Sequence, residues 1–484
     1  MNPFLPLNEY IPDGEPHVFG DRVYLYGSHD KARGTRFCVQ DYTVWSAPVD
    51  DLSKWTNHGV TYKKMQDPRS KPGREVDYYA PDCVRGNDGR YYLYYCAMGP
   101  NTKNFGPMSV AVSNRPEGPF DYLGDIQYAD GTPVLKYLTN DPAVINDNGR
   151  IWLYYGWGLA RDFRSKILSP LYNFVQSKLF ARPISEIKET KPSILSCAVV
   201  ELCDDMMTVK GEPKAVLDSK TTAPKDSELY NHAFYEAPSI RKIGDTYYLV
   251  YSSGENNELC YATSVYPNKG FEYRGVIISN SDLGYKGNKK KKAPAGTIHG
   301  GIECINGKWY VFYHRCTNNT DFSRQACAEP IEILADGSIS QVEITTQGVG
   351  EPIKAVGELE AARCCNLITK KSVRLGVGKA QKRTRIDDDG KGIFVADIED
   401  GTELGYKYLS FTNVKKISLT CRGKEAVIEI FINDERQKCG EIKTQNTETW
   451  QSFSADVDIS DGTHALYLKI KGKGKRDMKE IKFN

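Results

Sequence analysis

One pattern of apolar, polar and aromatic residues recurs five times along the first two thirds of the chain. Each copy runs from a short apolar stretch through a tight polar turn into a strand rich in aromatic residues. Alternating apolar residues on both sides of a glycine-bearing turn are typical of a β-hairpin. The five copies are DGEPHVFGDRVYLYGS from Asp13, APDCVRGNDGRYYLYYC from Ala80, DPAVINDNGRIWLYYG from Asp141, EAPSIRKIGDTYYLVYS from Glu236 and HGGIECINGKWYVFYH from His299.

The spacing of these hairpins predicts a five-bladed β-propeller over residues 1–350. The units recur roughly every 60 to 95 residues, which leaves room for four strands in each, and radial closure protects their edges. Helical periodicity of useful length is nearly absent, and residues 183–190 predict at most a short turn. After residue 350, short strands at close spacing, from SVRLGV at 372–377 to HALYLKIKG at 464–472, predict a β-sandwich over 351–484. We therefore expect an all-β chain of two domains.

The residue that opens each unit shares its register with the others. Asp13, Asp141, Glu236 and His299 each stand 11 residues before an aromatic residue, and Ala80 holds this place in the second unit. Corresponding positions on innermost strands converge near the axis of a propeller. Three carboxylic acids are thus expected to meet, which indicates a functional site.

Three acids around one centre favour hydrolysis of a glycosidic bond. Inverting hydrolysis needs one protonated acid and one carboxylate, separated by roughly 6.5–9.5 Å. Asp13 is the expected base. Glu236, in the apolar and aromatic setting HAFYEAPSI, is the expected acid with a raised pKa, and the charge of Asp141 keeps it protonated. Taken singly, an acid beside Pro or Gly is more often a turn or cap residue, so the shared register carries this interpretation.

Other side chains are candidates for binding, and each has a structural alternative. His299, flanked by glycine, is either a ligand of an axial cation or a hydrogen-bonded core histidine. Arg324, with Arg315 as a competitor, is a candidate for holding a sugar hydroxyl or a carboxylate. The candidates for stacking on a sugar face are Trp157, Tyr79 and Tyr235, each of which suits simple packing equally well.

Composition restricts the partners and the compartment. Lys and Arg total 64 against 62 Asp and Glu, so no global field attracts nucleic acid or acidic polymers, and a neutral substrate fits better. The 13 cysteines show no zinc-ligand spacing and suggest a reducing compartment. The first residues lack a leader pattern and no long apolar run occurs, so no membrane span is expected. We expect a cytoplasmic protein, or a secreted one if a signal peptide has been removed.

At these motifs the chain resembles glycoside hydrolase family 43 over residues 5–345, in the segments IPDGEPHVFGDRVYLYGSHD, NDPAVINDNGRIWLYYG, YEAPSIRKIGDTYYLVYS and FYHR with FSRQACAE. The resemblance implies exo-acting, inverting release of pentoses from plant cell-wall arabinan, arabinoxylan or xylan. It makes Asp13 the base, Asp141 the orienting and pKa-modulating residue and Glu236 the acid, and it places Arg324 at the substrate. It also implies a cation, usually calcium, near His299, with no cofactor for the chemistry itself.

One departure concerns the first motif, which reads DGEPH where members commonly show Asp-Pro. Asp13 precedes Arg22 by nine residues, as Asp141 precedes Arg150, so Asp13 is kept as the base and Glu15 is the alternative.

The last third of the chain, in LGYKYLSFTNVKKISLTCRG and TWQSFSADVDISDGTHALYLKIKGKG, is similar to a family 6 carbohydrate-binding module. This similarity implies a jelly-roll sandwich, often with a structural calcium. Such a domain either binds carbohydrate or completes the rim of the active site.

The predicted function is an inverting exo-glycoside hydrolase that releases terminal α-L-arabinofuranosyl or β-D-xylosyl residues from oligosaccharides or polysaccharides. An endo-arabinanase or a galactofuranosidase of the same fold is the alternative within this chemistry. A retaining propeller hydrolase and a non-catalytic carbohydrate-binding propeller are alternatives from other classes.

Overall fold

The computed structural model describes residues 1–99, 105–159, 169–189, 193–255, 257–318, 320–370, 383–433 and 437–484. Strands dominate these residues and helices are few, which confirms the all-β prediction. The predicted strand SVRLGV at 372–377 lies outside the described residues.

Five antiparallel sheets follow one another along the first part of the described chain. The first contains β1 (Glu15–Phe19), β2 (Arg22–Tyr26), β3 (Tyr42–Pro48) and β4 (Thr56–Tyr62), and the second β5 (Asp77–Arg85), β6 (Tyr91–Met98), β7 (Ser109–Ser113) and β8 (Asp121–Asp125). The third contains β9 (Ala143–Asp147), β10 (Arg150–Gly156), β11 (Ser196–Leu202) and β12 (Lys214–Asp218), and the fourth β13 (Phe234–Ile243), β14 (Thr246–Ser253), β15 (Glu258–Ser264) and β16 (Glu272–Ser279). The fifth contains β17 (Ile302–Ile305), β18 (Lys308–Cys316) and β19 (Arg324–Ile331).

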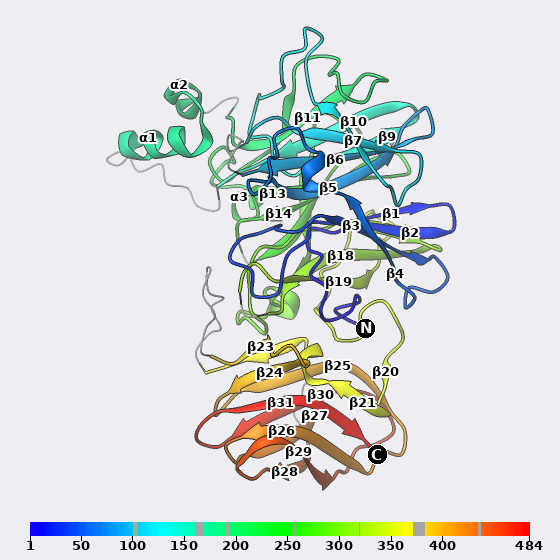
Figure 1. Ribbon diagram of the computed structural model, residues 1–484, viewed down its shortest axis with the longest axis vertical. Coiled ribbons are helices and arrows are strands. Elements are labelled where there is room, and N and C mark those ends of the chain that lie inside the picture. The colour runs from blue at the N-terminus through cyan, green and yellow to red at the C-terminus, as the bar shows by residue number, and fades with distance from the viewer. Residues whose placement is uncertain are drawn as a thin grey trace.

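The first strand of every sheet lies innermost, and these five strands close a ring. β1 contacts β5, β5 contacts β9, β9 contacts β13, β13 contacts β17, and β17 returns to β1. The sheets are therefore the five blades of a propeller, as the repeat predicts (Figure 1).

Buried tyrosines pack in clusters between neighbouring blades. Tyr62, Tyr78 and Tyr95 form one such cluster between the first two blades, with the rings of Tyr62 and Tyr78 stacked at 5.1 Å. The hydroxyl groups of Tyr62 and Tyr95 lie 3.0 Å apart, so the polar atoms are paired inside the apolar cluster. Aromatic strands thus hold neighbouring blades together.

The ring closes where the N-terminal residues run beside the last blade. The backbone N–H of Phe4 donates to the carbonyl of Ala326 at 3.2 Å. Asn2, which is fully buried, donates to the carbonyl of Ala328 and accepts from its N–H, both at 3.0 Å, and also donates to Glu329 at 2.8 Å. The two ends of the propeller are therefore joined by hydrogen bonds.

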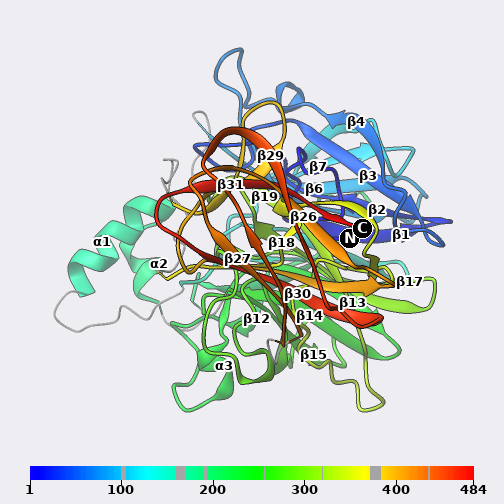
Figure 2. The same ribbon diagram turned by 90° about the horizontal axis from the view of Figure 1, so that it is seen from below.

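The C-terminal part forms two packed sheets, which lie below the propeller in Figure 1 and in front of it in Figure 2. Their core contains Tyr406, Leu419, Ile430, Leu466 and Ile481. One sheet contains β20 (Ile353–Lys354), β22 (Asn366–Ile368), β25 (Glu403–Phe411), β27 (Val427–Ile432), β28 (Gln437–Lys443) and β30 (Gly462–Lys471). The other contains β21 (Gly357–Glu360), β23 (Arg385–Asp388), β24 (Ile393–Ile398), β26 (Lys416–Gly423), β29 (Thr447–Asp456) and β31 (Arg476–Phe483). A β-sandwich follows the propeller, as predicted.

A helix that the sequence analysis did not predict projects from the third blade. It is α1 (Ser169–Phe180), and α2 (Ile184–Lys188) replaces the short turn expected at 183–190; α3 (Glu228–Asn231) precedes β13. Leu171, Phe174 and Val175 have helical spacing but are exposed, so the apolar positions do not mark a core-facing stripe. None of the described helices is long and apolar enough to cross a membrane.

Asn2→Ala is expected to destabilise the propeller, because it leaves polar groups of β19 buried without partners. We expect the free energy of unfolding to fall by about 2–3 kcal/mol, measured by denaturant unfolding. Asn8→Ala, at a nearby exposed position, is the control and should change it little. Equal stability of the two variants would show that the seam, where the N-terminal residues bind β19, does not depend on Asn2.

Candidate active site

The eight residues preferred as site residues from the sequence line one cavity of about 340 Å³ at the centre of the propeller. Its acids are Asp13, Asp141 and Glu236, which come from the first, third and fourth blades. Residues that the sequence analysis did not select complete the wall, among them Phe37, Phe105 and Phe180. The predicted residues in the wall are Asp13, Asp141, Glu236, His299, Arg324, Trp157, Tyr79 and Tyr235.

The register shared by the three acids is not identical, which corrects the sequence analysis. Asp13 and Asp141 have φ values of 56° and 48° and lie six residues before the last residue of their inner strands. In the fourth blade Ala237, with φ of 63°, holds this place, so Glu236 leaves the backbone one residue earlier. The pairing of β13 with β14 is irregular between Glu236 and Ser239, and this irregularity absorbs the shift.

Asp13 is buried beside a fixed positive charge. Its Oδ1 lies 2.7 Å from Nη1 of Arg324 and 3.8 Å from Nδ1 of His299. Burial alone would raise the pKa of Asp13, but the guanidinium of Arg324, followed by His314 and His299, lowers it to about 2. Asp13 is therefore a carboxylate across the working range of pH, as a base requires.

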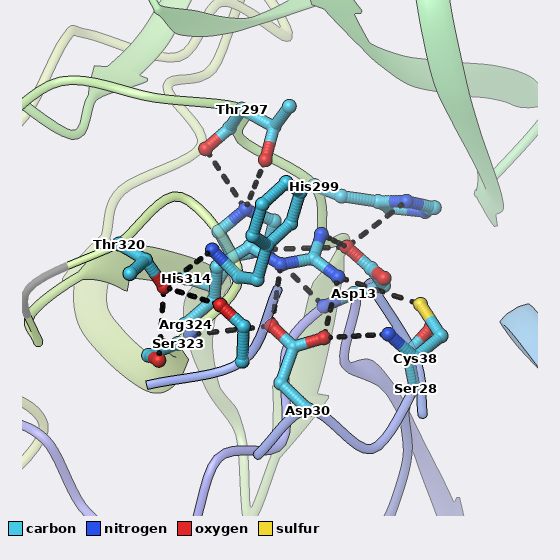
Figure 3. Close-up of polar contacts among 12 residues, drawn as sticks. Asp13, Ser28, Asp30, Cys38, Thr297, His299, His314, Thr320, Ser323 and Arg324 are labelled. Carbon is cyan, nitrogen blue, oxygen red and sulfur yellow. Dashed lines mark hydrogen bonds and ion pairs between the residues drawn. The ribbon is translucent and has the colours of Figure 1, made fainter. Parts of the chain in front are cut away.

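Arg324 is itself held by a second buried acid. Its Nε donates to Oδ2 of Asp30 at 2.8 Å and its Nη2 donates to Oδ1 at 3.2 Å (Figure 3). The guanidinium also lies over the ring of Phe37, 4.5 Å from the centroid. Because both its charge and its plane are fixed, Arg324 positions the carboxylate of Asp13.

Glu236, in contrast to Asp13, lies in an environment that favours its protonated form. It accepts a hydrogen bond from Nε1 of Trp157 at 3.1 Å. Burial, followed by the negative charge of Asp13, raises the pKa of Glu236 to about 7, although the Trp157 hydrogen bond and Arg324 oppose the shift. Glu236 therefore keeps its proton over much of the neutral range, as an acid catalyst requires.

The third acid, Asp141, is bound to the backbone beside Glu236. Its Oδ2 accepts a hydrogen bond at 3.0 Å from the N–H of Ala237, the residue that follows Glu236. Burial, then the charges of Glu236 and Asp13, raise the pKa of Asp141 well above its usual range. Asp141 and Glu236 consequently titrate as an interacting pair. The hydrogen bond from the Ala237 N–H also fixes Asp141 to the backbone that carries Glu236.

His314, which the sequence analysis did not select, holds the backbone of Asp13. Its Nδ1 accepts from the N–H of Asp13 at 3.1 Å, and its Nε2 donates to the carbonyl of Thr297 at 2.8 Å. Burial lowers the pKa of His314 to about 3 and that of His299 to about 4, so both rings are neutral near pH 7. Arg324 therefore remains positively charged beside Asp13 when both histidines are neutral.

Comparison with known proteins places this site in a family. A family model described as glycosyl hydrolases family 43 matches residues 2–339. The chain belongs to glycosyl hydrolase family 43. This confirms the resemblance on which the sequence analysis relied.

Relatives of this family 43 chain extend over different shares of its length. A xylosidase/arabinosidase of Thermoclostridium stercorarium is 41% identical over 99% of this chain and 98% of its own length. The GH43_1 enzyme of Xanthomonas citri, solved with xylotriose, is 26% identical over 70% of this chain and 92% of its own, with a TM-score of 0.53. An arabinoxylan arabinofuranohydrolase of Bacillus subtilis covers 100% of this chain and 97% of its own at 19% identity and a TM-score of 0.51, and so shares the fold.

Two alternatives from the sequence analysis lie away from this family 43 cavity. Glu15, the alternative base, is buried against Ser239, whose hydroxyl donates to it at 2.6 Å, and is paired with Arg241 at 2.9 Å. Arg315 donates to Sγ of Cys327 at 3.3 Å and to the carbonyl of Cys365 at 3.4 Å. Neither lines the cavity, whereas Asp13 and Arg324 do.

Among the described residues, no three His, Cys, Asp or Glu side chains gather around His299 closely enough to hold a metal ion. Calcium takes six to eight oxygen ligands, and no group of three potential ligands among the described residues contains His299 or lies in the sandwich. The group nearest to the inner strands includes Glu15, which is already bound by Ser239 and Arg241. Calcium therefore stays a prediction. The two groups found are Glu15–His17–Asp82 and His232–Glu258–Cys260.

Activity of this glycoside hydrolase should decline on the alkaline side, because Glu236 must hold a proton and its pKa is about 7. Asp13, with a pKa of about 2, should not limit activity on the acid side while the protein stays folded. A pH profile of kcat/KM on an aryl glycoside measures both limbs. An acid limb at about pH 5 in the folded enzyme would contradict the assignment of Asp13.

Trp157→Phe should move the alkaline limb to higher pH by up to about one unit, because the lost hydrogen bond normally lowers the pKa of Glu236. Phe105→Leu is the matched control, since Phe105 packs 5.6 Å from Trp157 but offers no donor. It should lower kcat/KM without moving the limb. Equal shifts in both variants would assign the effect to packing alone.

Proposed function

We propose that this chain is an inverting, exo-acting glycoside hydrolase that releases terminal α-L-arabinofuranosyl or β-D-xylosyl residues from plant cell-wall oligosaccharides. The carrying observation is that one cavity holds a carboxylate with a depressed pKa, Asp13, and a carboxyl with a raised pKa, Glu236. Two acids whose environments separate their pKa values are what acid and base catalysis of acetal cleavage needs.

In the proposed reaction a water molecule attacks the anomeric carbon while Asp13 takes its proton. Glu236 gives its proton to the leaving glycosidic oxygen as the bond to carbon breaks. Asp141 orients Glu236 through the Ala237 backbone, and the charge that raises the pKa of Glu236 comes from Asp13. The sugar is then released with inverted configuration, and the two carboxyl groups exchange protons with solvent. The hydrolysis needs no cofactor.

The size and lining of the cavity support an exo-acting enzyme for small sugars. Its volume of about 340 Å³ lies at the small end of the range for ligand sites. Trp157, Tyr79 and Tyr235 are half-buried, so their rings are available to a sugar face. Pentoses as the substrate class also agree with the xylosidase/arabinosidase that matches nearly the whole chain.

A panel of aryl α-L-arabinofuranoside, β-D-xyloside and β-D-galactofuranoside tests the proposal. We expect turnover of at least one pentoside, and a loss of about 10²–10⁴-fold in kcat for Asp13→Asn. Glu236→Gln should lose less on substrates with an activated aryl leaving group than on xylo- or arabino-oligosaccharides, because a good leaving group needs no acid. Asn8→Ala serves as the unaffected variant.

Proton NMR of the first-formed sugar gives the stereochemical outcome, and product sizes from linear oligosaccharides give the mode of attack. Retention of configuration would exclude the inverting mechanism, and release of oligomers would favour an endo-arabinanase. Turnover of the galactofuranoside alone would move the substrate to a hexose. Absence of turnover with unchanged sugar binding in Asp13→Asn would favour a non-catalytic propeller.

A further inference from the structure

The loop of residues 30–38, between β2 and β3, forms one side of the active site. Its first residue, Asp30, binds Arg324, and its last, Cys38, lies with Sγ 3.5 Å from Nη2 of the same arginine. The N–H of Cys38 donates to Oδ1 of Asp30 at 2.9 Å, so the two ends of the loop are tied together. Phe37 lines the cavity beneath the Arg324 guanidinium. The position of this loop therefore affects both the wall and the arginine that holds Asp13.

Within the propeller, the 30–38 loop contacts residues 320–323. The hydroxyl of Thr320 donates to the carbonyl of Gly34 at 3.2 Å, and that of Ser323 donates to the carbonyl of Lys31 at 3.0 Å. The rings of Phe37 and Phe322 meet edge to face at 4.5 Å. No strand ladder includes residues 30–38, so such contacts must set the course of the backbone.

The tip of the loop reaches the C-terminal domain. Arg33, with φ of 54°, donates through Nε to Oδ1 of Asp387 at 2.9 Å, and its Nη2 donates to Asp387 and to the carbonyl of Asp388. Asp387 is 5% exposed and lies on β23, where Nη2 of Arg385 pairs with its other oxygen at 2.7 Å. The side chain of Arg33 is 51% exposed, whereas the Asp387 carboxylate that it contacts is buried and held from its other side by Arg385. Charge-assisted hydrogen bonds of this kind fix the geometry of both partners.

We propose that Asp387 is a positioning residue of the active site. By binding Arg33, it fixes the 30–38 loop to the sandwich. The fixed loop in turn holds the ring of Phe37 in the cavity wall and the guanidinium of Arg324. The C-terminal domain then contributes to hydrolysis without touching the sugar. Small displacements of groups that orient a substrate or a catalytic carboxylate reduce rates strongly, so a contact at the loop tip has a measurable effect at the site.

Arg33→Ala is the main test variant, because Asp387 keeps Arg385 as a partner and the sandwich stays paired. Asp387→Ala is the second variant. Glu343→Gln is the matched control: it removes the charge from another contact between the domains, the ion pair of Nζ of Lys407 with Oε2 of Glu343 at 2.7 Å, away from the 30–38 loop. The three variants separate loop positioning from general attachment of the sandwich.

We expect Arg33→Ala and Asp387→Ala each to lower kcat/KM by about fivefold or more, mainly through KM, while Glu343→Gln stays within about twofold. The double variant should be no worse than the more affected single variant, since the contact between Arg33 and Asp387 is lost in both. Hydrogen–deuterium exchange of peptides covering residues 30–38 should rise in the two test variants and not in the control.

Two results would overturn the proposal. One is unchanged kinetics and unchanged exchange of residues 30–38 in both test variants; the other is an equal effect of Glu343→Gln, which would indicate attachment of the sandwich as a whole. The inference rests on the glycosidase site, and the exchange measurement separates the two claims. If the wild-type enzyme cleaves none of the aryl pentosides, exchange still decides whether Arg33 and Asp387 hold the loop.

Discussion

The site depends on one buried arginine placed between two buried aspartates. Arg324 contacts Asp13 at 2.7 Å and Asp30 at 2.8 Å, and all three side chains are shielded from solvent. A carboxylate in such a position would otherwise take up a proton, because burial penalises its charge. The guanidinium keeps Asp13 ionised, and with it the difference between Asp13 and Glu236 on which acid and base catalysis rests.

This arginine links the chemistry to the closure of the propeller. Asp13 precedes the first strand of the first blade, whereas Arg324 begins the last strand of the fifth. The same strand, β19, carries Ala326 and Ala328, which bind Phe4 and Asn2 at the seam. Asp13 and Arg324 therefore meet only because the two ends of the propeller are joined, so the hydrogen bonds of the seam also hold this ion pair together.

The repeat in the sequence predicted the blades and the place of the acids, because both follow from local spacing. A hairpin with a glycine-bearing turn is a short-range signal, and closure of five such units brings their first residues together without further information. The shift at Glu236 was not visible, since a spacing of 11 residues arises both from a regular hairpin and from one with an irregularity on β13. The outward-facing apolar residues of α1 had helical spacing, so a signal for that helix was present.

Other parts of the site could not be predicted because no repeat includes them. Asp30 and Phe37 lie in the connection between β2 and β3, outside the repeated hairpin, and His314 acts through the backbone of Asp13 rather than through a motif. The alternatives Glu15 and Arg315 resembled the chosen residues in type and neighbourhood. Only the fold shows that their side chains are paired elsewhere, with Ser239 and with Cys327.

The balance of charge around the cavity suits the transition state more than the substrate. The two histidines are neutral near pH 7, and Arg324 is shared between Asp13 and Asp30. Asp13, whose pKa is lowered to about 2, places a fixed carboxylate beside a neutral sugar. Cleavage of a glycosidic bond develops positive charge on the ring through an oxocarbenium-like state. Negative groups fixed before the reaction stabilise that charge more than they stabilise the uncharged ground state, and this difference is what lowers the barrier.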